Sequence, residues 1–439
     1  MKSHNEVFRR SLLAGAIIAT FAGSLAASFD ASAAGTLEGF ASLPAATFSK
    51  GPTAGHFVNG ANGEALPLID QQPVQGFSAV LPGPVAGTYQ MMCDNGFGTK
   101  ANSPDALLRF YTMKPNFRYW DGSAVVGTGV VNPVDRITGA KKDGFNAKTL
   151  VTLADPDHKL GFALVADGTN YPYSGSGPGS ATIPVDKAIK KGRLLTGSDL
   201  DIESMRVDKN GHYWFGEEFG PFLVKTDANG KVLRSEIPLA GVQGPDNPYL
   251  NGATPTLNSS NGYEGLAINA AGDTLYALLE GTVVGDPARS LRINEFSIDA
   301  EAYTGKKWMY SLDPSGTNIG DMTAVNSHQF IVIERNGTQE PRFKKLFLID
   351  LDVVDPTTGF VQKTELVDLM NIADPHDLNA DGQTVFTFPF VTIEDVLVLD
   401  AKTLLVMNDN NYPGSSRTAG VPDPNEFLKI HLDQKLKLE

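Results

Sequence analysis

Short apolar segments alternate with polar turns along most of this chain, and one arrangement of them returns at intervals. In each copy an acidic residue lies at the start of an apolar strand, a turn follows, and a second apolar strand ends in acidic or amide residues. The clearest copies begin at Ile202, Tyr263, Gly320 and Ile393, and a weaker copy without the leading acid begins at Gly76. Such a recurring unit predicts a repeat architecture built from β-strands.

The spacing of the copies predicts how many units there are. Units that begin near residues 76, 202, 263, 320 and 393 are separated by 126, 61, 57 and 73 residues. The first interval is about twice the others, which predicts a degenerate unit near residue 139 and six units in all. Four short strands per unit are typical of a propeller blade. The sequence therefore predicts an all-β fold, a six-bladed β-propeller.

The two ends of the repeat region predict how the ring closes. The last unit ends after its third strand, at residues 427–432, and residues 37–43 form a spare strand before the first unit. Pairing of these two segments would complete the last blade and remove an open edge. The alternative is an N-terminal arm that packs elsewhere. No second domain is indicated, so residues 35–439 are expected to form a single domain.

Residues 1–34 have the pattern of an export signal. Arg9 and Arg10 precede an apolar stretch over residues 12–27, and Ala31-Ser32-Ala33 matches a cleavage site. The paired arginines fit a twin-arginine signal as well as an ordinary secretory one. No other segment is long and apolar enough to cross a bilayer. We therefore expect a periplasmic or secreted protein.

The amino-acid composition limits the classes of partner that the protein is expected to bind. The net charge is −14, and it becomes −15 when residues 1–33, with three basic and two acidic residues, are removed. Nucleic acid binding needs a basic surface, so this charge disfavours it and fits a cation-binding protein. The single cysteine, Cys93, excludes an intramolecular disulfide. We expect a monomer that binds a small anionic substrate.

The leading acids of the units are expected to meet at one mouth of the channel, because the first strand of each blade lines it. These acids are Glu203, Glu264, Asp321 and either Glu394 or Asp395. Two carboxylates about 6 Å apart repel by roughly 3 kcal/mol at an effective dielectric near 20. Protonation, splaying into solvent or a bound cation must relieve that repulsion. Oxygen-only ligands favour Ca²⁺ or another hard divalent cation. The alternative is that each acid caps a turn between blades.

A second set of polar residues ends the second strands. Strand alternation places Glu217 and Glu218 on opposite sides, so one of them is expected to face a shared cleft. Arg335 introduces a cation among anions. Its planar fork suits a phosphate or carboxylate, and a salt bridge to a carboxylate such as Glu334 is the alternative role. Equivalent positions hold Glu280, Asp94-Asn95 and Asp409-Asn410.

Several of these segments together resemble the phytase-like family, known as "esterase-like activity of phytase". The matching segments are LTGSDLDIES at 195–204, WFGEEFGP at 214–221, YEGLA at 263–267, ERN at 334–336, DNGFG at 94–98 and NDN at 408–410. The resemblance covers residues 70–432 and implies a propeller-like fold and phosphate-ester hydrolysis. Two departures concern the metal geometry: Glu217 stands where an Asp is more usual, and Glu394-Asp395 replaces a Glu-Gly pair.

These observations lead to a set of expected site residues and functions. The metal-ligating residues are expected to be Glu203, Glu264, Glu217, Asp321, Asp94, Asn95 and Asp409, and the catalytic residues Glu218, Arg335 and Glu334. The favoured function is an exported, Ca²⁺-dependent phosphatase of the phytase-like type. One alternative is a lactonase or carboxyl esterase that uses the same metal. The other is a non-enzymatic periplasmic binding or scaffold propeller with a structural cation.

Overall fold

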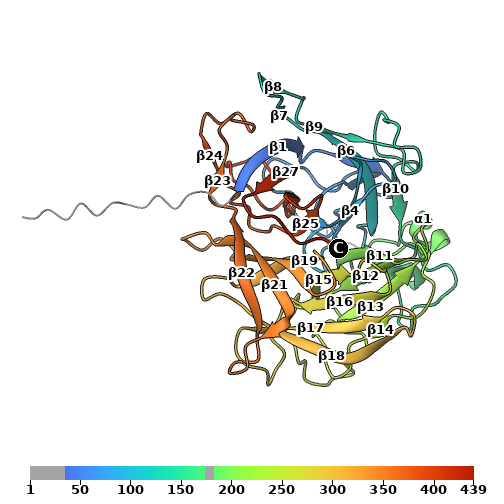
Figure 1. The fold of residues 1–439 in the computed structure, drawn as a ribbon. Coiled ribbons are helices and arrows are strands. Elements are labelled where there is room, and N and C mark those ends of the chain that lie inside the picture. The colour runs from blue at the N-terminus through green and yellow to red at the C-terminus, as the bar shows by residue number, and fades with distance from the viewer. Residues whose placement is uncertain (1–34, 174–181) are drawn as a thin grey trace, which may run out of the picture. The chain divides into compact units, whose positions relative to one another are not determined.

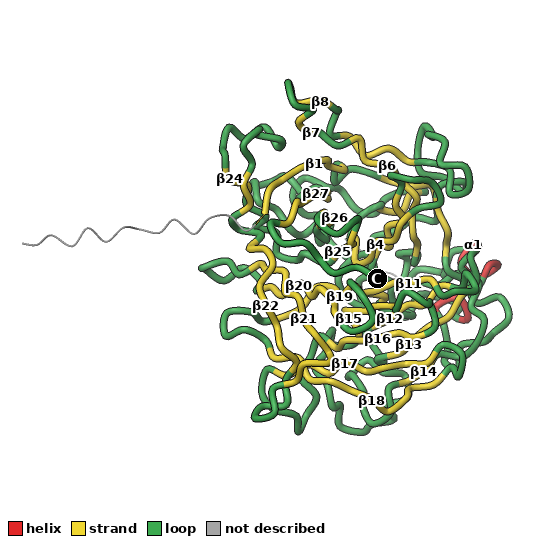
Figure 2. Tube along the Cα trace, viewed as in Figure 1, coloured by secondary structure: helices red, strands yellow, loops and turns green. Residues whose placement is uncertain are grey.

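β-strands make up most of the ordered elements in the computed structural model, which describes residues 35–173 and 182–439 (Figures 1 and 2). The described helices are one 3-10 turn, η1 (Val165–Asp167), and one short α-helix, α1 (Lys187–Gly192). The expected export signal, residues 1–34, lies outside the described residues. No helix in the described part of the chain is long and apolar enough to cross a membrane.

Five units of four antiparallel strands form the body of the fold (Figure 1). The first contains β4 (Phe77–Pro82), β5 (Tyr89–Cys93), β6 (Arg109–Asn116) and β9 (Val130–Pro133). The next two contain β11 (Ile202–Val207), β12 (Tyr213–Glu217), β13 (Phe222–Thr226), β14 (Ile237–Pro238), and β15 (Tyr263–Ile268), β16 (Thr274–Leu279), β17 (Ser290–Ser297), β18 (Ala302–Ser311). The last two contain β19 (Asn318–Ala324), β20 (Gln329–Arg335), β21 (Lys344–Val354), β22 (Val361–Asp368), and β25 (Asp395–Val398), β26 (Thr403–Met407), β27 (Asn425–Leu432), β1 (Gly35–Leu43).

The innermost strands of the five units follow one another around a centre. β4 contacts β11, β11 contacts β15, β15 contacts β19, β19 contacts β25, and β25 contacts β4 again. This order is that of a β-propeller with one inner strand per blade. In the described part of the chain, three short pairs lie outside the blades: β2 (Phe48–Lys50) with β3 (Gln71–Pro73), β7 (Tyr119–Trp120) with β8 (Val125–Val126), and β23 (Ile372–Ala373) with β24 (Val385–Phe386).

The prediction of six blades is wrong for the described residues, which form five four-stranded units. The doubled interval holds an insertion, and its strand β10 (Leu150–Thr152) pairs with the existing strand β6. Leu153, Leu160 and Leu195 of the insertion are buried in the apolar cluster between the first two blades. Because these residues complete a core that neighbouring blades already form, they do not build a sheet of their own.

The pairing predicted for the N-terminal segment is the one observed. β1 runs antiparallel to β27, with Leu37 opposite Ile430 and Phe40 opposite Leu428. Ser42 also bridges to Val130 of β9, in the first blade. The N-terminal strand thus lies between the last and first blades in the sheet order.

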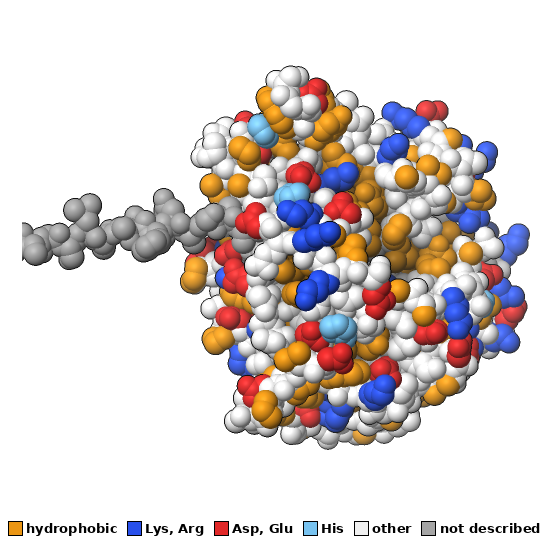
Figure 3. All heavy atoms as spheres, viewed as in Figure 1, with side chains coloured by type: hydrophobic (Ala, Val, Ile, Leu, Met, Phe, Trp, Pro, Cys, Tyr) orange, Lys and Arg blue, Asp and Glu red, His pale blue; other side chains and the backbone are white. Residues whose placement is uncertain are grey.

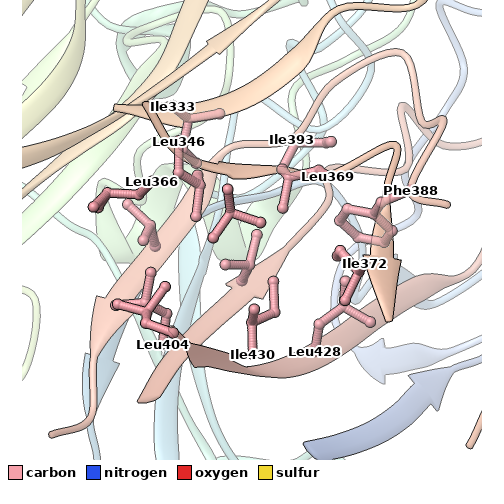
Figure 4. Close-up of a cluster of buried hydrophobic side chains, with 14 of the residues drawn as sticks. Ile333, Leu346, Leu366, Leu369, Ile372, Phe388, Ile393, Leu404, Leu428 and Ile430 are labelled. Carbon is pink, nitrogen blue, oxygen red and sulfur yellow. The ribbon is translucent and has the colours of Figure 1, made fainter. Parts of the chain in front are cut away.

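Apolar side chains fill the spaces between adjacent blades. Figure 4 shows one such cluster, in which Ile333 and Leu346 of the fourth blade pack with Leu404 and Leu428 of the fifth. Burial of each such side chain contributes about 1.5–3 kcal/mol. Inner strands such as β11 and β15 are buried on both faces, because a blade packs against each face. Outer strands such as β18 are exposed along much of their length.

A β-bulge recurs at the start of the inner strands and determines which side chains reach the centre. The pairing slips between Phe77 and Ala79 in β4, between Ile202 and Ser204 in β11, between Tyr263 and Gly265 in β15, and between Ile319 and Met322 in β19. A bulged residue leaves the hydrogen-bond ladder and its side chain takes a new direction. The residues at this position are Ser78, Glu203, Glu264 and Gly320, and Glu394 occupies the corresponding place just before β25.

Gly320 is required at its bulge, because a Cβ there would overlap the carbonyl oxygen of Ile393 in the next blade. Gly320→Ala is therefore expected to lower the free energy of unfolding by about 1–3 kcal/mol, as overpacking usually does. Gly144→Ala is the matched control, since a Cβ at Gly144 has nothing within 4 Å. Urea unfolding of both variants measures the difference, and equal stabilities would contradict the close approach of these two strands.

Candidate functional site

Two sets of equivalent residues meet at one end of the inner strands. Antiparallel pairing places the start of each inner strand beside the end of the second strand of its blade, as with Ile202 opposite Glu217 and Tyr263 opposite Leu279. The bulge set is Ser78, Glu203, Glu264, Gly320 and Glu394. The strand-end set is Asp94, Glu218, Glu280, Arg335 and Asp409. We call the acids of both sets, together with Asp201, the carboxylate centre.

Within the carboxylate centre, two groups of oxygens are close enough to share an ion. Asp201, Glu203 and Glu218 place one carboxylate oxygen each within 4.8 Å of the others, and Glu218, Glu264 and Glu280 do the same. All five residues are buried. Glu218 belongs to both groups, and its buried Oε1 has no hydrogen-bond partner among the described residues. The centre is therefore organised around Glu218.

Arg335 supplies a positive charge at the edge of this centre. Its Nη2 lies 2.8 Å from Glu394 Oε1, 3.3 Å from Glu264 Oε1 and 3.5 Å from Glu280 Oε1. Its buried Nε has no acceptor in the described part of the chain. Burial alone would lower the pKa of Arg335, but the neighbouring carboxylates outweigh burial and raise it. Arg335 comes from the same blade as Gly320, so this blade contributes a cation and no acid to the two sets.

Burial and mutual repulsion keep the acids of the centre protonated to unusually high pH. Burial raises the pKa of Asp201 to about 6, and burial with the nearby Asp94 raises the pKa of Asp409 to about 7. Burial and Asp409 raise the pKa of Glu394 to about 8. Burial, followed by neighbouring charges, raises the pKa of Glu218 well above its usual value. Two charges 4.8 Å apart repel by roughly 3 kcal/mol at an effective dielectric near 20. Protons or a cation must therefore compensate the centre.

Five of the residues expected from the sequence lie in the carboxylate centre: Glu203, Glu264, Glu218, Asp94 and Asp409. Glu217 lies on the other side of its strand, as alternation predicts. Its carboxylate accepts hydrogen bonds from the backbone N–H groups of Phe219 at 3.0 Å and Gly220 at 2.7 Å. Both of its oxygens are thus used to cap the turn after β12, and the structure does not bring Glu217 to Glu203 and Glu264.

Asn95 supports the centre through another residue. Its Oδ1 accepts from the N–H of Gly98 at 2.7 Å and of Phe97 at 3.2 Å, which fixes the turn after β5. Its Nδ2 donates to Asp201 Oδ1 at 2.7 Å. Asn95 therefore orients Asp201, and its own oxygen is occupied by the turn.

Asp321 lies apart from Glu203 and Glu264 because the repeat was aligned one residue out of register. The slip in β19 spans both Gly320 and Asp321, and Gly320 is the residue that follows the paired Ile319 as Glu264 follows the paired Tyr263 in β15. Neighbouring residues of a strand point to opposite sides, so a shift of one residue redirects the side chain. Asp321 instead accepts hydrogen bonds from Arg206 Nη2 at 3.0 and 3.3 Å.

Glu334, expected to be catalytic, is held in the outer part of its blade. Its carboxylate accepts from Tyr310, from the N–H of Asp313 and, at 2.7 Å, from Lys363 Nζ. It is fully buried and points away from its neighbour Arg335, because adjacent strand residues alternate. These contacts are those of a residue that fixes the third and fourth strands.

Glu334→Ala is expected to lower the free energy of unfolding by roughly 3 kcal/mol, because it leaves buried donors unpaired. Affinity for Ca²⁺ should stay the same. Glu365→Ala is the control: Glu365 pairs with Lys345 at 2.7 Å but is 43% exposed, so its loss should cost about 0–1 kcal/mol. Urea unfolding and calcium titration check both variants. A loss of Ca²⁺ affinity in Glu334→Ala would place this residue in the site after all.

The expected set lacked three acids of the centre. Glu280 and Glu394 occupy positions equivalent to Glu218 and Glu203, and the repeat had already indicated both, with Asp395 as the alternative to Glu394. Asp201 has no such signal, because the corresponding residues of the other blades are not acidic: Gly76, Gly262, Asn318 and Thr392. Only the fold brings Asp201 beside Glu218.

A cavity of about 330 Å³ adjoins the centre at Asp94 and Asp409. Phe97, Tyr412 and Gly76 also line it. Gly76 has a φ of +65°, and a Cβ there would lie 2.6 Å from Asp94 Oδ1. A small molecule in this cavity would lie against Asp94 and Asp409.

Comparison with known proteins gives a family match over most of the chain. The phytase-like family, described as "esterase-like activity of phytase", matches residues 72–412. An uncharacterized secreted protein of Arthroderma benhamiae is 28% identical over 206 residues, which are 41% of this chain and 36% of that protein. The match thus spans about a third of the relative's length.

Solved structures give weaker likenesses. Regucalcin, a calcium-binding protein of Agrobacterium tumefaciens, is 10% identical with a TM-score of 0.34, covering 88% of this chain and 97% of its own. A glycosyl hydrolase of Bacteroides ovatus is 10% identical with a TM-score of 0.39, covering 92% and 96%.

Proposed function

This chain belongs to the phytase-like family, and on that premise we propose that it is an exported hydrolase of phosphate esters that depends on Ca²⁺. The observation that carries the proposal is Glu218, a buried carboxylate shared by two groups of acids with one oxygen left unpartnered. The alternatives of a lactonase and of a binding protein would use the same cation site, and the assays below separate them.

The residues fit a hard cation. Ca²⁺ binds oxygen ligands at about 2.3–2.6 Å, so ligands of one ion lie at most about 5 Å apart. The oxygens in each group of acids satisfy this limit, since they lie within 4.8 Å of one another. An unpartnered buried carboxylate oxygen is costly, and a cation would remove that cost. Asp201, Glu203, Glu218, Glu264 and Glu280 are the proposed ligands.

A bound Ca²⁺ would polarise a phosphoryl oxygen and make a water molecule more acidic. Arg335 would orient the phosphoryl group, because its Nε–H has no acceptor among the described residues while Nη2 stays on Glu394. Asp409 would accept the proton of the attacking water, since it lines the cavity and its pKa, raised by burial to about 7, suits a general base. Glu218, expected from the sequence to be a catalytic residue, would instead hold the cation.

Arg335→Lys is expected to raise KM for 4-nitrophenyl phosphate about tenfold, because lysine keeps the charge and loses the planar fork. Ca²⁺ affinity should change little. Arg206→Lys is the matched control: this buried arginine pairs with Asp321, whereas Arg335 pairs with three acids of the carboxylate centre. Steady-state kinetics and calorimetry measure the two effects. An equal rise of KM in both variants would mean that Arg335 has no special contact with substrate.

The test of the proposal is an assay of 4-nitrophenyl phosphate, bis(4-nitrophenyl) phosphate and 4-nitrophenyl acetate, each with Ca²⁺ and with EDTA. We expect the phosphomonoester to be cleaved only with Ca²⁺. Preferential cleavage of the acetate would favour the esterase alternative. No metal-dependent turnover of any substrate would favour the binding protein.

Export is the remaining part of the proposal. It is supported by the signal pattern in residues 1–34 and by the name of the relative from A. benhamiae, which describes a secreted protein. N-terminal sequencing of the mature protein from the periplasm or medium would test export.

Basic and acidic side chains are interspersed on the face shown in Figure 3, which is not the continuous basic surface that nucleic acid requires.

A further inference from the structure

The cavity beside the carboxylate centre has two different walls. Its inner wall carries Asp94 and Asp409, which belong to the carboxylate centre and lie near its other acids. The remaining lining residues are apolar or uncharged, and include Phe97, Tyr412 and Pro413. A substrate whose phosphate is held in the centre would therefore place the rest of its structure against the second wall.

The rings in the second wall are fixed in position. Phe97 is 7% exposed and Tyr412 is 4% exposed, so neighbouring groups restrict both. Tyr412 packs edge-on against Phe48, with ring centroids 6.2 Å apart, and its hydroxyl donates to Glu64 at 3.2 Å. Because both rings are already fixed, packing a substrate against the part of each ring that lines the cavity costs little side-chain entropy. This wall suits a ring or another compact apolar group.

The lining of the cavity holds no lysine or arginine in the described part of the chain. Arg417 follows the loop that forms one side of it, but its guanidinium pairs with Asp423 and Glu426 at 3.1 and 2.7 Å. Arg335, in the centre itself, contacts three carboxylates. An additional negative charge on the substrate would face acids with no cation to receive it. Like charges at such short range in a buried site repel one another.

We infer that the site takes phosphomonoesters whose alcohol part is a compact, uncharged ring, and that it discriminates against substrates with several anionic groups, such as inositol polyphosphates. This inference rests on the proposed function, because the metal and the centre hold the phosphate. The inference adds the class of substrate to that proposed function. The family's description names phytase, and the lining of this cavity points to a different substrate.

Binding of phosphonates to the Ca²⁺-loaded full-length protein tests the inference without turnover. Calorimetry should show that 4-methylphenylphosphonate binds about tenfold or more tightly than 4-carboxyphenylphosphonate, a ring of similar size with one more charge. It should also bind about tenfold more tightly than methylphosphonate, which has no ring. Equal or tighter binding of the carboxylated compound would overturn the inference.

A cavity-filling variant shows whether this cavity is responsible. Ala61 lines the cavity and is partly exposed, so Ala61→Trp can fill the space without entering the core. The preference for the ring over methylphosphonate should fall to within about threefold in Ala61→Trp and stay intact in the control Ala61→Ser. An unchanged preference in Ala61→Trp would overturn the assignment to this cavity.

Turnover separates the inference from the function on which it rests. Faster cleavage of inositol hexakisphosphate than of 4-nitrophenyl phosphate would overturn the inference and leave the phosphatase proposal standing. Phosphonate selectivity without cleavage of any phosphate ester would overturn the phosphatase proposal and support the selectivity of the cavity.

Discussion

Glu218→Gln is expected to weaken Ca²⁺ binding about a hundredfold, equivalent to roughly 2.7 kcal/mol. The change keeps the shape of the side chain and removes one negative charge. It acts on the residue that both groups of acids share and that carries an unpartnered buried oxygen. Calcium titration by calorimetry at pH 8 measures the effect, and turnover of 4-nitrophenyl phosphate should fall with it.

The chain offers a closely matched control in the neighbouring residue. Glu217→Gln makes the same chemical change one position earlier, at a carboxylate that caps the turn after β12. Its Ca²⁺ affinity should stay within about threefold of the wild type. If both variants, or neither, lost affinity, Glu218 would have no special role in binding the ion.

The second large effect is that Ca²⁺ should stabilise the fold more strongly as pH rises. In the unfolded chain carboxyl groups lose their protons near pH 4. In the metal-free fold, Asp201, Asp409 and Glu394 keep theirs until pH values of about 6, 7 and 8, because burial raises each pKa. The folded state thus binds more protons than the unfolded state between about pH 4 and 8. The free energy of unfolding must then fall as pH rises through this window.

Ca²⁺ replaces those protons with a charge that does not depend on pH. At about 100 times its Kd it should add roughly 2.7 kcal/mol if it binds only the folded state. Binding should also release protons, which calorimetry in buffers of different ionisation enthalpy detects. Scanning calorimetry at pH 5 to 8 should show Tm in EDTA falling with pH, and the gap to Tm in millimolar Ca²⁺ widening. Coincident melting temperatures across this range would contradict a cation in the centre.

The repeat could be predicted from the sequence because each blade packs its apolar side chains between two neighbouring blades. Inner strands are buried on both faces although they carry polar residues such as Glu203 and Arg206 in β11. The edge strand of the last blade is supplied by the segment that lacked a partner, with Leu37 opposite Ile430. The number of blades was harder to predict from the sequence. An interval of doubled length fits a weak blade or an insertion equally well, and only the contacts of residues such as Leu153 show that this segment joins an existing core.

The site was predictable where it follows the repeat and not where it departs from it. Glu203 and Glu264 share a bulge position, so periodicity alone identifies them. Asp321 was expected in the site because it is the acid nearest to that position in β19, but the residue equivalent to Glu264 is Gly320. A shift of one residue places a side chain on the opposite side of a strand. Asp201 has no equivalent in the other blades. The blade that contributes Gly320 and Arg335 in place of two acids breaks the symmetry of the centre, and we expect the substrate to be oriented there.

The central claim, that the carboxylate centre holds Ca²⁺, is tested most directly by diffraction from crystals of the protein grown in millimolar CaCl₂, with anomalous scattering to identify calcium. The account predicts a calcium peak bonded to Glu218 and to at least two of Asp201, Glu203, Glu264 and Glu280, at about 2.3–2.6 Å. Carboxyl groups that hydrogen-bond to one another around Glu218, with no calcium peak within bonding distance of it, would contradict the claim.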